Sequence, residues 1–289
     1  MKIYKNIFHK YKIKKQGIIA IGYFDSFHIG HKKILNELIN IANKKNIQNY
    51  VLTYDNLPLK KNNSEKLIEL DKKLELFKEI GVKNILIGDT NTNFFKLSSI
   101  EFINILKNNF NINEYVIGKD FKFGYKESGS INDLKNAGCI THFIEPIKIN
   151  DHLVSTSYIK KLIIEGKIEE ANKNLGYNYF IIGVNKKSKQ IGRKIGFPTM
   201  NIYNNNVLYP KNGVYITKTF IKNIEYLSMT YVNNKIIESY LLNYDKFKYN
   251  LKIKVDFFKK IRDNAHFKDI TLLKKQLEKD LEKVIDYFK

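Results

Sequence analysis

Two histidines lie on either side of a glycine, as His28, Gly30 and His31, where an apolar run gives way to a helical pattern. The apolar run, residues 18–21, is rich in β-branched side chains and predicts a buried strand. After it, apolar residues recur at helical spacing, at Ile34, Leu35, Leu38, Ile39 and Ala42. A helix N-terminus that follows a strand presents unpaired N–H groups and a positive dipole end, which bind phosphate. Two imidazoles there can donate hydrogen bonds to phosphoryl oxygens, and Gly30 leaves the backbone open to a phosphate.

A second candidate segment, Gly-Lys-Asp-Phe-Lys-Phe-Gly at residues 118–124, follows another apolar run. A flat heterocycle could stack on either phenylalanine, and Asp120 could accept a hydrogen bond from a ring or a sugar. The alternative is a turn that contributes two phenylalanines to the core. Farther along, residues 155–157 place three hydroxyls before Lys160, which suits either a helix N-cap or a triphosphate.

Up to Gly176, segments with strand and helix patterns alternate. Strands are predicted at residues 18–21, 50–54, 84–87, 115–118 and 140–144, and helices at residues 34–42, 65–80 and 98–110. Strands that alternate with helices favour a mostly parallel, doubly wound sheet, whose ligands bind at the carboxyl ends of the strands. Three strand ends are therefore candidate sites, at residues 22–31, 53–58 and 118–124.

After Gly176 the pattern changes to short runs of Ile, Val, Tyr and Phe separated by Asn, Lys and Gly. Strands are predicted at residues 179–184, 214–220, 226–232, 236–244 and 251–258. Closely spaced strands indicate an antiparallel barrel or a sandwich, and we expect the amphipathic helix at residues 270–288 to pack on it. The predicted fold is α/β, with a doubly wound Rossmann-like domain at residues 1–176 and a β-barrel with a terminal helix at residues 177–289.

The composition favours a globular protein of the cytoplasm. Hydrophobic residues make up 43% of the chain, and no apolar run approaches the roughly 20 residues that cross a bilayer. The single cysteine, Cys139, can form no internal disulfide, which suits a reducing compartment. The net charge of +21 would suit a nucleic-acid-binding protein, but nearly all of it is lysine scattered along the chain. We therefore expect neither a nucleic-acid nor a membrane partner.

Taken alone, the two histidines could be ordinary surface residues at a helix start. The segment around them, residues 22–31, resembles the nucleotidyltransferase signature Gly-x-Phe-Asp-Gly-x-His-x-Gly-His, with Ser26 in place of a glycine. Residues 118–124 and 155–157 resemble further motifs of the adenylyltransferase half of bacterial bifunctional FAD synthetases. Two later segments resemble the kinase half of the same family: Gly-Phe-Pro-Thr-Met-Asn at residues 196–201 and Glu-Ser-Tyr-Leu-Leu at residues 238–242. The motifs keep the family's order over nearly the whole chain.

The resemblance implies that the first domain is a nucleotidyltransferase that adenylylates FMN with ATP, producing FAD and pyrophosphate. His28 and His31 would be the catalytic pair that stabilises the transferring phosphoryl group. The implied ATP-binding residues are Gly22, Phe24, His28, Gly30, His31, Ser155, Thr156 and Lys160. The implied FMN-binding residues are Asp120 and Phe123.

The resemblance also implies that the second domain phosphorylates riboflavin to FMN with ATP. Glu238 would take the proton from the ribityl hydroxyl, although by spacing alone it could equally be an exposed strand residue. The implied ATP- and flavin-binding residues are Gly183, Gly192, Arg193, Thr199, Asn201 and Arg262. Thr199 and Asn201 would hold Mg²⁺ through their oxygens.

Two departures from the family pattern leave alternatives open. Lys160 stands where the family has an arginine, which keeps the charge but loses the bidentate fork. Residues 231–235 are shorter than the family's Asn-x-Gly-x-x-Pro-Thr segment, which leaves an FMN adenylyltransferase with a decayed kinase half as one alternative. Others are a nucleotidyltransferase for pantetheine phosphate or nicotinate mononucleotide, and a basic nucleic-acid-binding protein.

Overall fold

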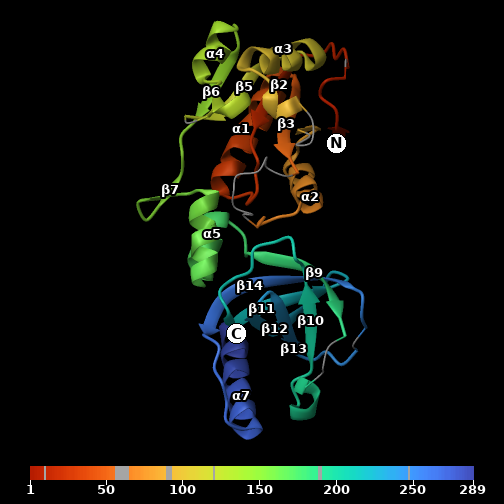
Figure 1. The fold of residues 1–289 in the computed structure, drawn as a ribbon, viewed down its shortest axis with the longest axis vertical. Helices are drawn as coiled ribbons and strands as arrows, with labels where there is room; N and C mark the ends of the chain where they lie inside the picture. Colours follow the sequence, from red (N-terminus) through yellow and green to blue (C-terminus); the bar gives the residue numbers. More distant parts are fainter. Residues whose placement is uncertain (10, 56–64, 89–92, 120, 188–190, 247) are drawn as a thin grey trace. The chain divides into compact units, whose positions relative to one another are not determined.

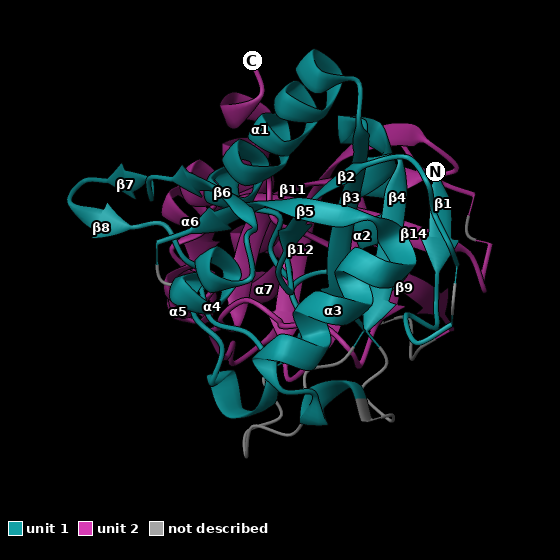
Figure 2. Cartoon of the chain, turned by 90° about the horizontal axis from the view of Figure 1, so that it is seen from above, with its two compact units in different colours: residues 1–155 teal, residues 156–289 magenta. Residues whose placement is uncertain are grey.

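The computed structural model describes residues 1–289 except residues 10, 56–64, 89–92, 120, 188–190 and 247. The chain divides into two compact units, Met1–Ser155 and Thr156–Lys289 (Figure 2). Across the described residues, no helix is long and apolar enough to cross a membrane.

The first unit is built on a six-stranded sheet with the strand order β1-β4-β3-β2-β5-β6, in which every neighbouring pair is parallel (Figure 1 and Figure 2). Its strands are β1 (Lys2–Tyr4), β2 (Gly17–Ile21), β3 (Gln48–Tyr54), β4 (Asn84–Gly88), β5 (Ile112–Gly118) and β6 (Ile140–Ile144). Its helices are α1 (Ile29–Lys45), α2 (Leu70–Ile80), α3 (Ser99–Phe110) and α4 (Ile131–Asn136), and a small pair, β7 (Lys148–Ile149) and β8 (His152–Leu153), follows the sheet. The predicted doubly wound sheet is confirmed. Strand β1 was not predicted, because three residues carry too little pattern.

Both faces of this sheet are covered, because successive side chains of a strand point to opposite faces. Ile19 and Tyr115 point to one face, where they share a core cluster with Phe102 and Leu106 of α3. The neighbouring Ile18, also buried, points to the other face, and α1 contacts β2, β3 and β5. Strands buried on both faces have continuous apolar sequences, which is why the central ones were predicted correctly.

The helix predicted at residues 65–80 begins only at Leu70. The Leu67 N–H donates to Asp25 Oδ1 at 2.9 Å, which draws the residues before α2 onto the loop after β2. Leu67 is itself buried. The apolar residues before Leu70 therefore reflect packing against that loop and do not continue the helix.

The second unit is a six-stranded antiparallel barrel, which closes in the order β10-β13-β12-β11-β14-β9. Its strands are β9 (Phe180–Lys186), β10 (Thr199–Tyr203), β11 (Gly213–Ile221), β12 (Ile224–Asn233), β13 (Ile236–Leu241) and β14 (Lys252–Arg262). Helices α5 (Thr156–Glu165) and α6 (Ile168–Leu175) precede the barrel, and α7 (Ile270–Tyr287) follows it. The structure thus decides between the two predicted architectures in favour of the barrel. The shortened segment at residues 231–235 comprises the end of β12 and a two-residue turn before β13, with both turn residues, Asn234 and Lys235, at positive φ.

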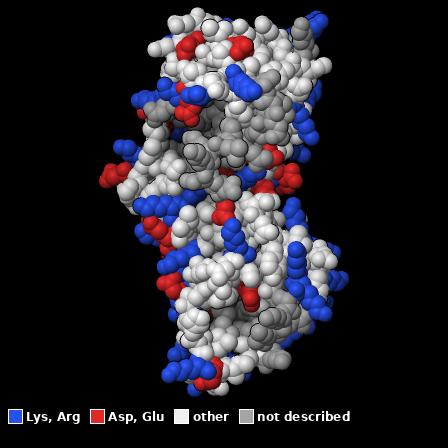
Figure 3. All heavy atoms as spheres, in the orientation of Figure 1, with Lys and Arg blue, Asp and Glu red and all other residues white. Residues whose placement is uncertain are grey.

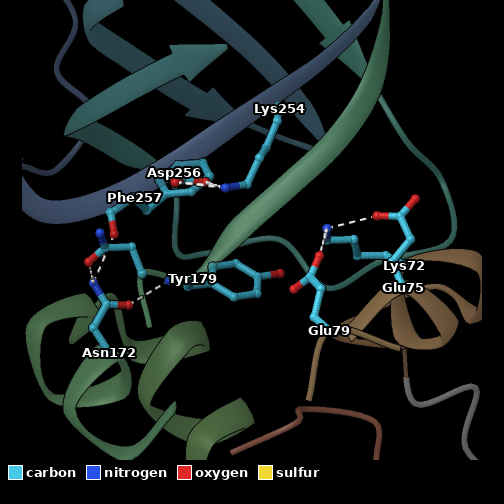
Figure 4. A network of polar contacts seen from close by, with 9 residues as sticks. Lys72, Glu75, Glu79, Asn172, Tyr179, Lys254, Asp256 and Phe257 are labelled. Carbon is cyan, nitrogen blue, oxygen red and sulfur yellow. Dashed lines mark hydrogen bonds and ion pairs between the residues drawn. The ribbon is translucent and has the colours of Figure 1, made fainter. Parts of the chain in front are cut away.

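The side-chain amide of Asn172 fixes α6 to the barrel. Its Nδ2 donates to the Phe257 carbonyl at 2.9 Å, and its Oδ1 accepts from the Tyr179 N–H at 2.7 Å (Figure 4). Helix α5 packs against α6. Both helices are therefore part of the barrel unit.

A row of hydroxyls fills part of the barrel interior. Thr217, Thr219, Ser228, Thr230 and Ser239 are all fully buried, and neighbouring hydroxyl oxygens of the row lie 2.7–2.8 Å apart. Because a hydroxyl can donate and accept at once, the row satisfies its own polar groups without water.

Helix α7 packs on the outside of the barrel wall. Its buried Val284, together with Leu277 and Leu281, contacts a cluster that includes Val214 of β11 and Met229 of β12. The expected packing of the terminal helix against the barrel is confirmed.

Candidate active sites

His28 is the N-cap of α1, with extended backbone angles of −67° and 171°. Its Nδ1 accepts from the His31 N–H at 3.1 Å, which assigns the imidazole proton to Nε2. A Cβ on Gly30 would lie only 3.1 Å from Cε1 of His28, so a side chain at position 30 would crowd the ring. An imidazole therefore caps this helix, and its Nε2–H points away from the cap as a donor.

The two imidazoles are stacked, with ring centroids 3.6 Å apart and planes 11° from parallel. Burial lowers the pKa of His28 to about 4. Burial holds the pKa of His31 well below its usual range, and the nearby His28 and Lys73 lower this pKa further. Both rings are therefore neutral at pH 7, and each offers one N–H donor to a phosphate without a positive charge.

Two phenylalanines shape the loop that leads to His28. Phe24 and Phe27 are buried at positive φ, 52° and 45°, a conformation that costs about 1–2 kcal/mol per residue. Both rings meet Phe77 of α2 edge-on, at 5.5 and 5.4 Å between centroids, and this packing offsets the strain. A Cβ on Gly22 would lie 3.1 Å from the ring of Phe24. Phe24, which was predicted to contact ATP, is placed in the core with its ring 5.1 Å from that of His31.

The second candidate segment follows β5. Asp120 lies outside the described residues, and Phe123 is buried and stacked on Phe121 at 5.5 Å. Phe121 is half-buried and lines a pocket of about 350 Å³ together with Lys119 and Lys122. Of the two rings, Phe121 is therefore the one exposed to a heterocycle.

The remaining predicted residues of the adenylyltransferase come from both units. Ser155 is the last residue of the first unit, while Thr156 begins α5 and Lys160 lies about one turn later, in the second unit. Of the strand end at residues 53–58, only residues 53–55 are described.

A pocket of about 580 Å³ lies on the outer face of the barrel, with residues of α7 in its lining. Glu238, Thr199, Tyr240 and Arg262, which come from three different strands, line it. Strands β10 and β13 pair with Asn201 opposite Glu238 and Thr199 opposite Tyr240. Residues that lie opposite each other in antiparallel strands point to the same face, so the pairing brings the predicted kinase residues together.

Glu238 is half-buried, and burial raises the pKa of its carboxyl group, while the Thr199 hydroxyl, 3.5 Å away, acts in the opposite direction. A carboxylate with a raised pKa is suited to accept a proton near neutral pH. Tyr231, opposite Glu238 on β12, also lines the pocket. Burial raises the pKa of the Tyr231 hydroxyl, and the nearby Glu238 carboxylate raises it further. The Arg262 guanidinium acts in the opposite direction and lowers this pKa.

Arg262 is held in place by α7. Its Nε donates to Oδ2 of the fully buried Asp280 at 2.8 Å, and Gln276 donates to the other carboxylate oxygen at 2.9 Å. The guanidinium lies 5.8 Å from the ring centroid of Phe267. Helix α7 therefore contributes apolar lining to the pocket and also orients its cation.

The other predicted kinase residues have different positions. A Cβ on Gly192, which lines the pocket, would lie 2.2 Å from a backbone carbonyl oxygen, so only glycine fits there. Gly183 lies in β9, where a Cβ would lie 2.5 Å from a carbonyl oxygen of β10. Arg193 is exposed in the 3-10 turn Ile191–Ile195. Of the described residues predicted for this site, Gly183, Arg193 and Asn201 do not line the pocket.

The oxygen donors on this face of β10 and β13 suit a hard cation. Within the described part of the chain, no group of three or more His, Cys, Asp or Glu could hold a metal. Thr199, Asn201 and Glu238 instead place a hydroxyl, an amide and a carboxylate on one face. Mg²⁺ keeps several waters and binds through one or two protein oxygens plus substrate phosphates, so this donor set fits it.

Sequence reasoning did not identify three residues near the sites: Lys73, Tyr231 and Asp280. Lys73 lies four residues before the buried Phe77, and Asp280 four residues before the buried Val284. A charged residue within an apolar helical stripe was therefore the available signal for Lys73 and Asp280. The alternation of β12 offered no such signal for Tyr231.

Charged side chains do not gather into one basic surface on the face drawn in Figure 3. Lysines and arginines there are scattered among acidic and uncharged residues. This distribution does not support the nucleic-acid alternative.

Comparison with known proteins gives a consistent result. Models of the families FAD synthetase and riboflavin kinase match residues 10–158 and 175–288. The bifunctional riboflavin kinase/FMN adenylyltransferase of Buchnera aphidicola subsp. Schizaphis graminum is 34% identical, over 100% of this chain and 99% of its own. The protein of the same name from Bacillus subtilis is 30% identical, over 94% and 93%. A crystal structure described as a macrolide-efflux protein from Streptococcus pneumoniae superposes with a TM-score of 0.88 at 24% identity, over 97% of both chains, which shows the fold alone.

Proposed function

This chain belongs to the family of bifunctional riboflavin kinases/FMN adenylyltransferases, and from this we propose how its residues divide the two reactions. The protein phosphorylates riboflavin to FMN with ATP, and it adenylylates FMN to FAD with release of pyrophosphate. The observation that carries the division is the pairing of β10 with β13, which places Glu238, Thr199 and Asn201 on one face within the kinase match.

For adenylyl transfer, the phosphate of FMN attacks the α-phosphorus of ATP and pyrophosphate leaves. A phosphate is already an anion at neutral pH, so this step needs no strong base and depends on positioning and charge stabilisation. The Nε2–H of His28, the ring of His31 and the N-terminus of α1 bind the transferring group.

The remaining groups of this reaction hold its two ends. Ser155, Thr156 and Lys160 bind the departing pyrophosphate, as the sequence predicts. The half-buried ring of Phe121, backed by Phe123, stacks on the isoalloxazine, and Asp120 contributes to FMN binding, as the sequence predicts.

For phosphorylation, Glu238 accepts the proton of the ribityl 5′-hydroxyl, whose oxygen attacks the γ-phosphorus of ATP and releases ADP. Thr199 and Asn201 would hold Mg²⁺ through their oxygens, and the ion would supply positive charge to the transferred phosphoryl group. Arg262, oriented by Asp280, contacts the nucleotide or the flavin, and so does Gly192, which lines the same pocket. Gly183 and Arg193 also bind the nucleotide or the flavin, as the family resemblance implies.

We assign residues 1–176 to adenylyl transfer and residues 177–289 to phosphorylation. This boundary keeps Thr156 and Lys160 with the reaction that they serve, whereas Asn172 ties α6 to the barrel. We place both reactions in the cytoplasm, which suits a protein whose one cysteine is a free thiol.

Two assays on the purified protein test this proposal: riboflavin with MgATP for FMN, and FMN with MgATP for FAD. We expect both products, and we expect chelation of Mg²⁺ to abolish both. FAD from FMN without FMN from riboflavin would identify a decayed kinase. The absence of both products would contradict the proposal.

A further inference from the structure

Lys73 on α2 is a buried lysine that neither reaction above uses, with 2% of its surface exposed. Its Nζ donates to the carbonyl oxygens of Tyr23 at 2.8 Å and Tyr54 at 3.0 Å, and lies 4.4 Å from the ring centroid of Tyr23. Its hydrogen-bond partners are thus neutral carbonyls. These carbonyl oxygens and the nearby carboxylates of Asp25 and Asp55 offset the cost of burying the ammonium, so Lys73 is a cation fixed at this place in the fold.

The two carbonyls belong to neighbouring parts of the candidate phosphate site. Tyr23 lies between β2 and His28, and Tyr54 is the last residue of β3. Strands β2 and β3 pair in parallel, so their carboxyl ends lie side by side. Lys73 therefore joins two adjacent strand ends at the edge where such sheets bind ligands.

Helix α2 also contacts the loop between β2 and His28 through Phe77, one helical turn after Lys73. Phe77 packs against Phe24 and Phe27, the two buried residues with positive φ. Lys73 and Phe77 lie four residues apart and so share one face of the helix. That face fixes the loop before His28 through a polar anchor and an apolar anchor.

The charge of Lys73 complements the neutral histidines. Lys73 lies near enough to His31 to contribute to the lowered pKa of that imidazole. The phosphates gathered for the transfer are highly charged, and two neutral N–H donors balance only part of that charge. A fixed cation in a buried position acts more strongly than one in water.

We propose that Lys73 is a positioning residue for adenylyl transfer, whose ammonium joins the ends of β2 and β3 and supplies positive charge behind His28 and His31. This rests on the proposed function of the first unit and adds to it a residue that does not contact the substrate.

The proposal predicts a pH dependence. Burial lowers the pKa of Lys73 to about 8, while Asp25 and Asp55 raise it and Lys66 lowers it. The titratable groups that act on or near it are Asp25, Asp55, Lys66, Tyr23 and His31. The unfolded lysine titrates near pH 10.5, so between pH 8 and 10.5 the unfolded state binds more protons and this group favours folding as pH rises. A loss of rate above pH 8 through Lys73 is therefore not a loss of folded protein.

The experiment compares the wild type with Lys73→Met, Lys73→Arg and the control Lys72→Met. Lys72 is the adjacent lysine, which pairs with Glu75 at 2.8 Å (Figure 4). FMN adenylylation and riboflavin phosphorylation are followed from pH 6.5 to 9.5 on the same samples, with separate kcat and KM. In the wild type and in Lys72→Met we expect adenylylation to fall with a midpoint near pH 8. Lys73→Met should be about 10²-fold slower at pH 7 and lack that midpoint, because a small misplacement of reacting groups has an effect of this size.

Rescue by charge separates a positioning role from a structural one. Lys73→Arg should keep more activity than Lys73→Met and move the midpoint upward, while riboflavin phosphorylation stays unchanged in all variants. A folded Lys73→Met with adenylylation within twofold of wild type and the midpoint intact would overturn the proposal. If Lys73→Met does not fold, the same comparison is made with Lys73→Gln, again by adenylylation rate and pH midpoint. A wild type whose adenylylation rate shows no midpoint between pH 7 and 9.5 would also overturn the proposal. A wild type that makes no FAD would instead contradict the proposed function of the first unit.

Discussion

The reactions that we propose for residues 1–176 and 177–289 are of the same kind, transfer of a group from ATP, but they use different side chains. At the start of α1, two stacked and neutral imidazoles face the site, whereas the barrel pocket contains a half-buried carboxylate with a raised pKa. The difference follows from the nucleophile. The phosphate of FMN is ionised before it attacks, while the hydroxyl of riboflavin must lose a proton. A transferase site therefore needs a strong base only where its nucleophile still carries a proton at working pH.

The strongest test of this contrast removes the base from the barrel. Glu238→Gln keeps the size and hydrogen-bonding capacity of the side chain but not its basicity. We expect riboflavin phosphorylation to fall about 10²–10⁴-fold, the usual contribution of general base catalysis, and FMN adenylylation to continue. Both rates are measured on one sample, with Glu282→Gln on an exposed position of α7 as the control. Unchanged FMN production would remove Glu238 from the mechanism and erase the contrast.

The complementary change is His28→Ala in the first unit. It deletes one preoriented donor to the developing phosphoryl charge, which typically costs about 10²–10³ in rate. FAD formation should fall by that factor and FMN formation should stay constant. His9→Ala, at an exposed histidine of the same unit, is the control. If both activities fell together in a folded His28→Ala, the division of one reaction to each site would be wrong.

A smaller effect is expected from Arg262→Lys, which keeps the charge but loses the Nε–H that contacts Asp280. A hydrogen bond to a charged group contributes about 1.5–3 kcal/mol, and the free energy of unfolding of the barrel should fall by that amount. Urea unfolding measures this change, and the KM for riboflavin should rise with it. Lys252→Arg, at an exposed position of the same strand, should have neither effect. Unchanged unfolding of Arg262→Lys would show that the pair does not hold α7.

The smallest expected effect is a change of stability with pH. His28 takes up a proton near pH 6.5 in the unfolded chain and near pH 4 in the folded one. The folded state therefore loses stability as the pH falls from 6.5 to 4, by about 1 kcal/mol per pH unit for this group. An NMR titration of the imidazole, with urea unfolding at pH 6.5 and 5.5, measures both quantities. A midpoint near 6.5 would mean that burial does not lower the pKa of His28, and the loss of stability between pH 6.5 and 5.5 would then be absent.

Local sequence determined much of the fold, and long-range contacts determined what it missed. The central strands were predictable because burial on both faces produces continuous apolar runs, as at residues 18–21. The start of α2 was not, because it depends on a hydrogen bond between Leu67 and Asp25, which lie 42 residues apart.

The candidate sites follow the same rule. His28 and Gly30 were identifiable because they lie within one short segment, and their geometry depends on neighbours in the chain. Asp280 orients Arg262 only because α7 packs on the barrel, and Lys73 reaches Tyr23 only because α2 covers the loop after β2. Each of these charged residues interrupts an apolar helical stripe, but its partner is not evident from the local sequence.

The row of hydroxyls inside the barrel limits how this protein can change over generations. Thr230 bonds to both Thr217 and Ser239, so a valine there, nearly the same in shape, would leave the buried Ser239 hydroxyl without this partner, while Thr217 keeps its bond to Ser228. Each such orphan costs about 1–3 kcal/mol, although an interior made apolar throughout would carry no such cost. A substitution that removes a single hydroxyl is thus less favourable than either the complete row of hydroxyls or a fully apolar interior. A lineage that has inherited these hydroxyls can lose them only through several coordinated substitutions, so the interior of the barrel is preserved by its own history.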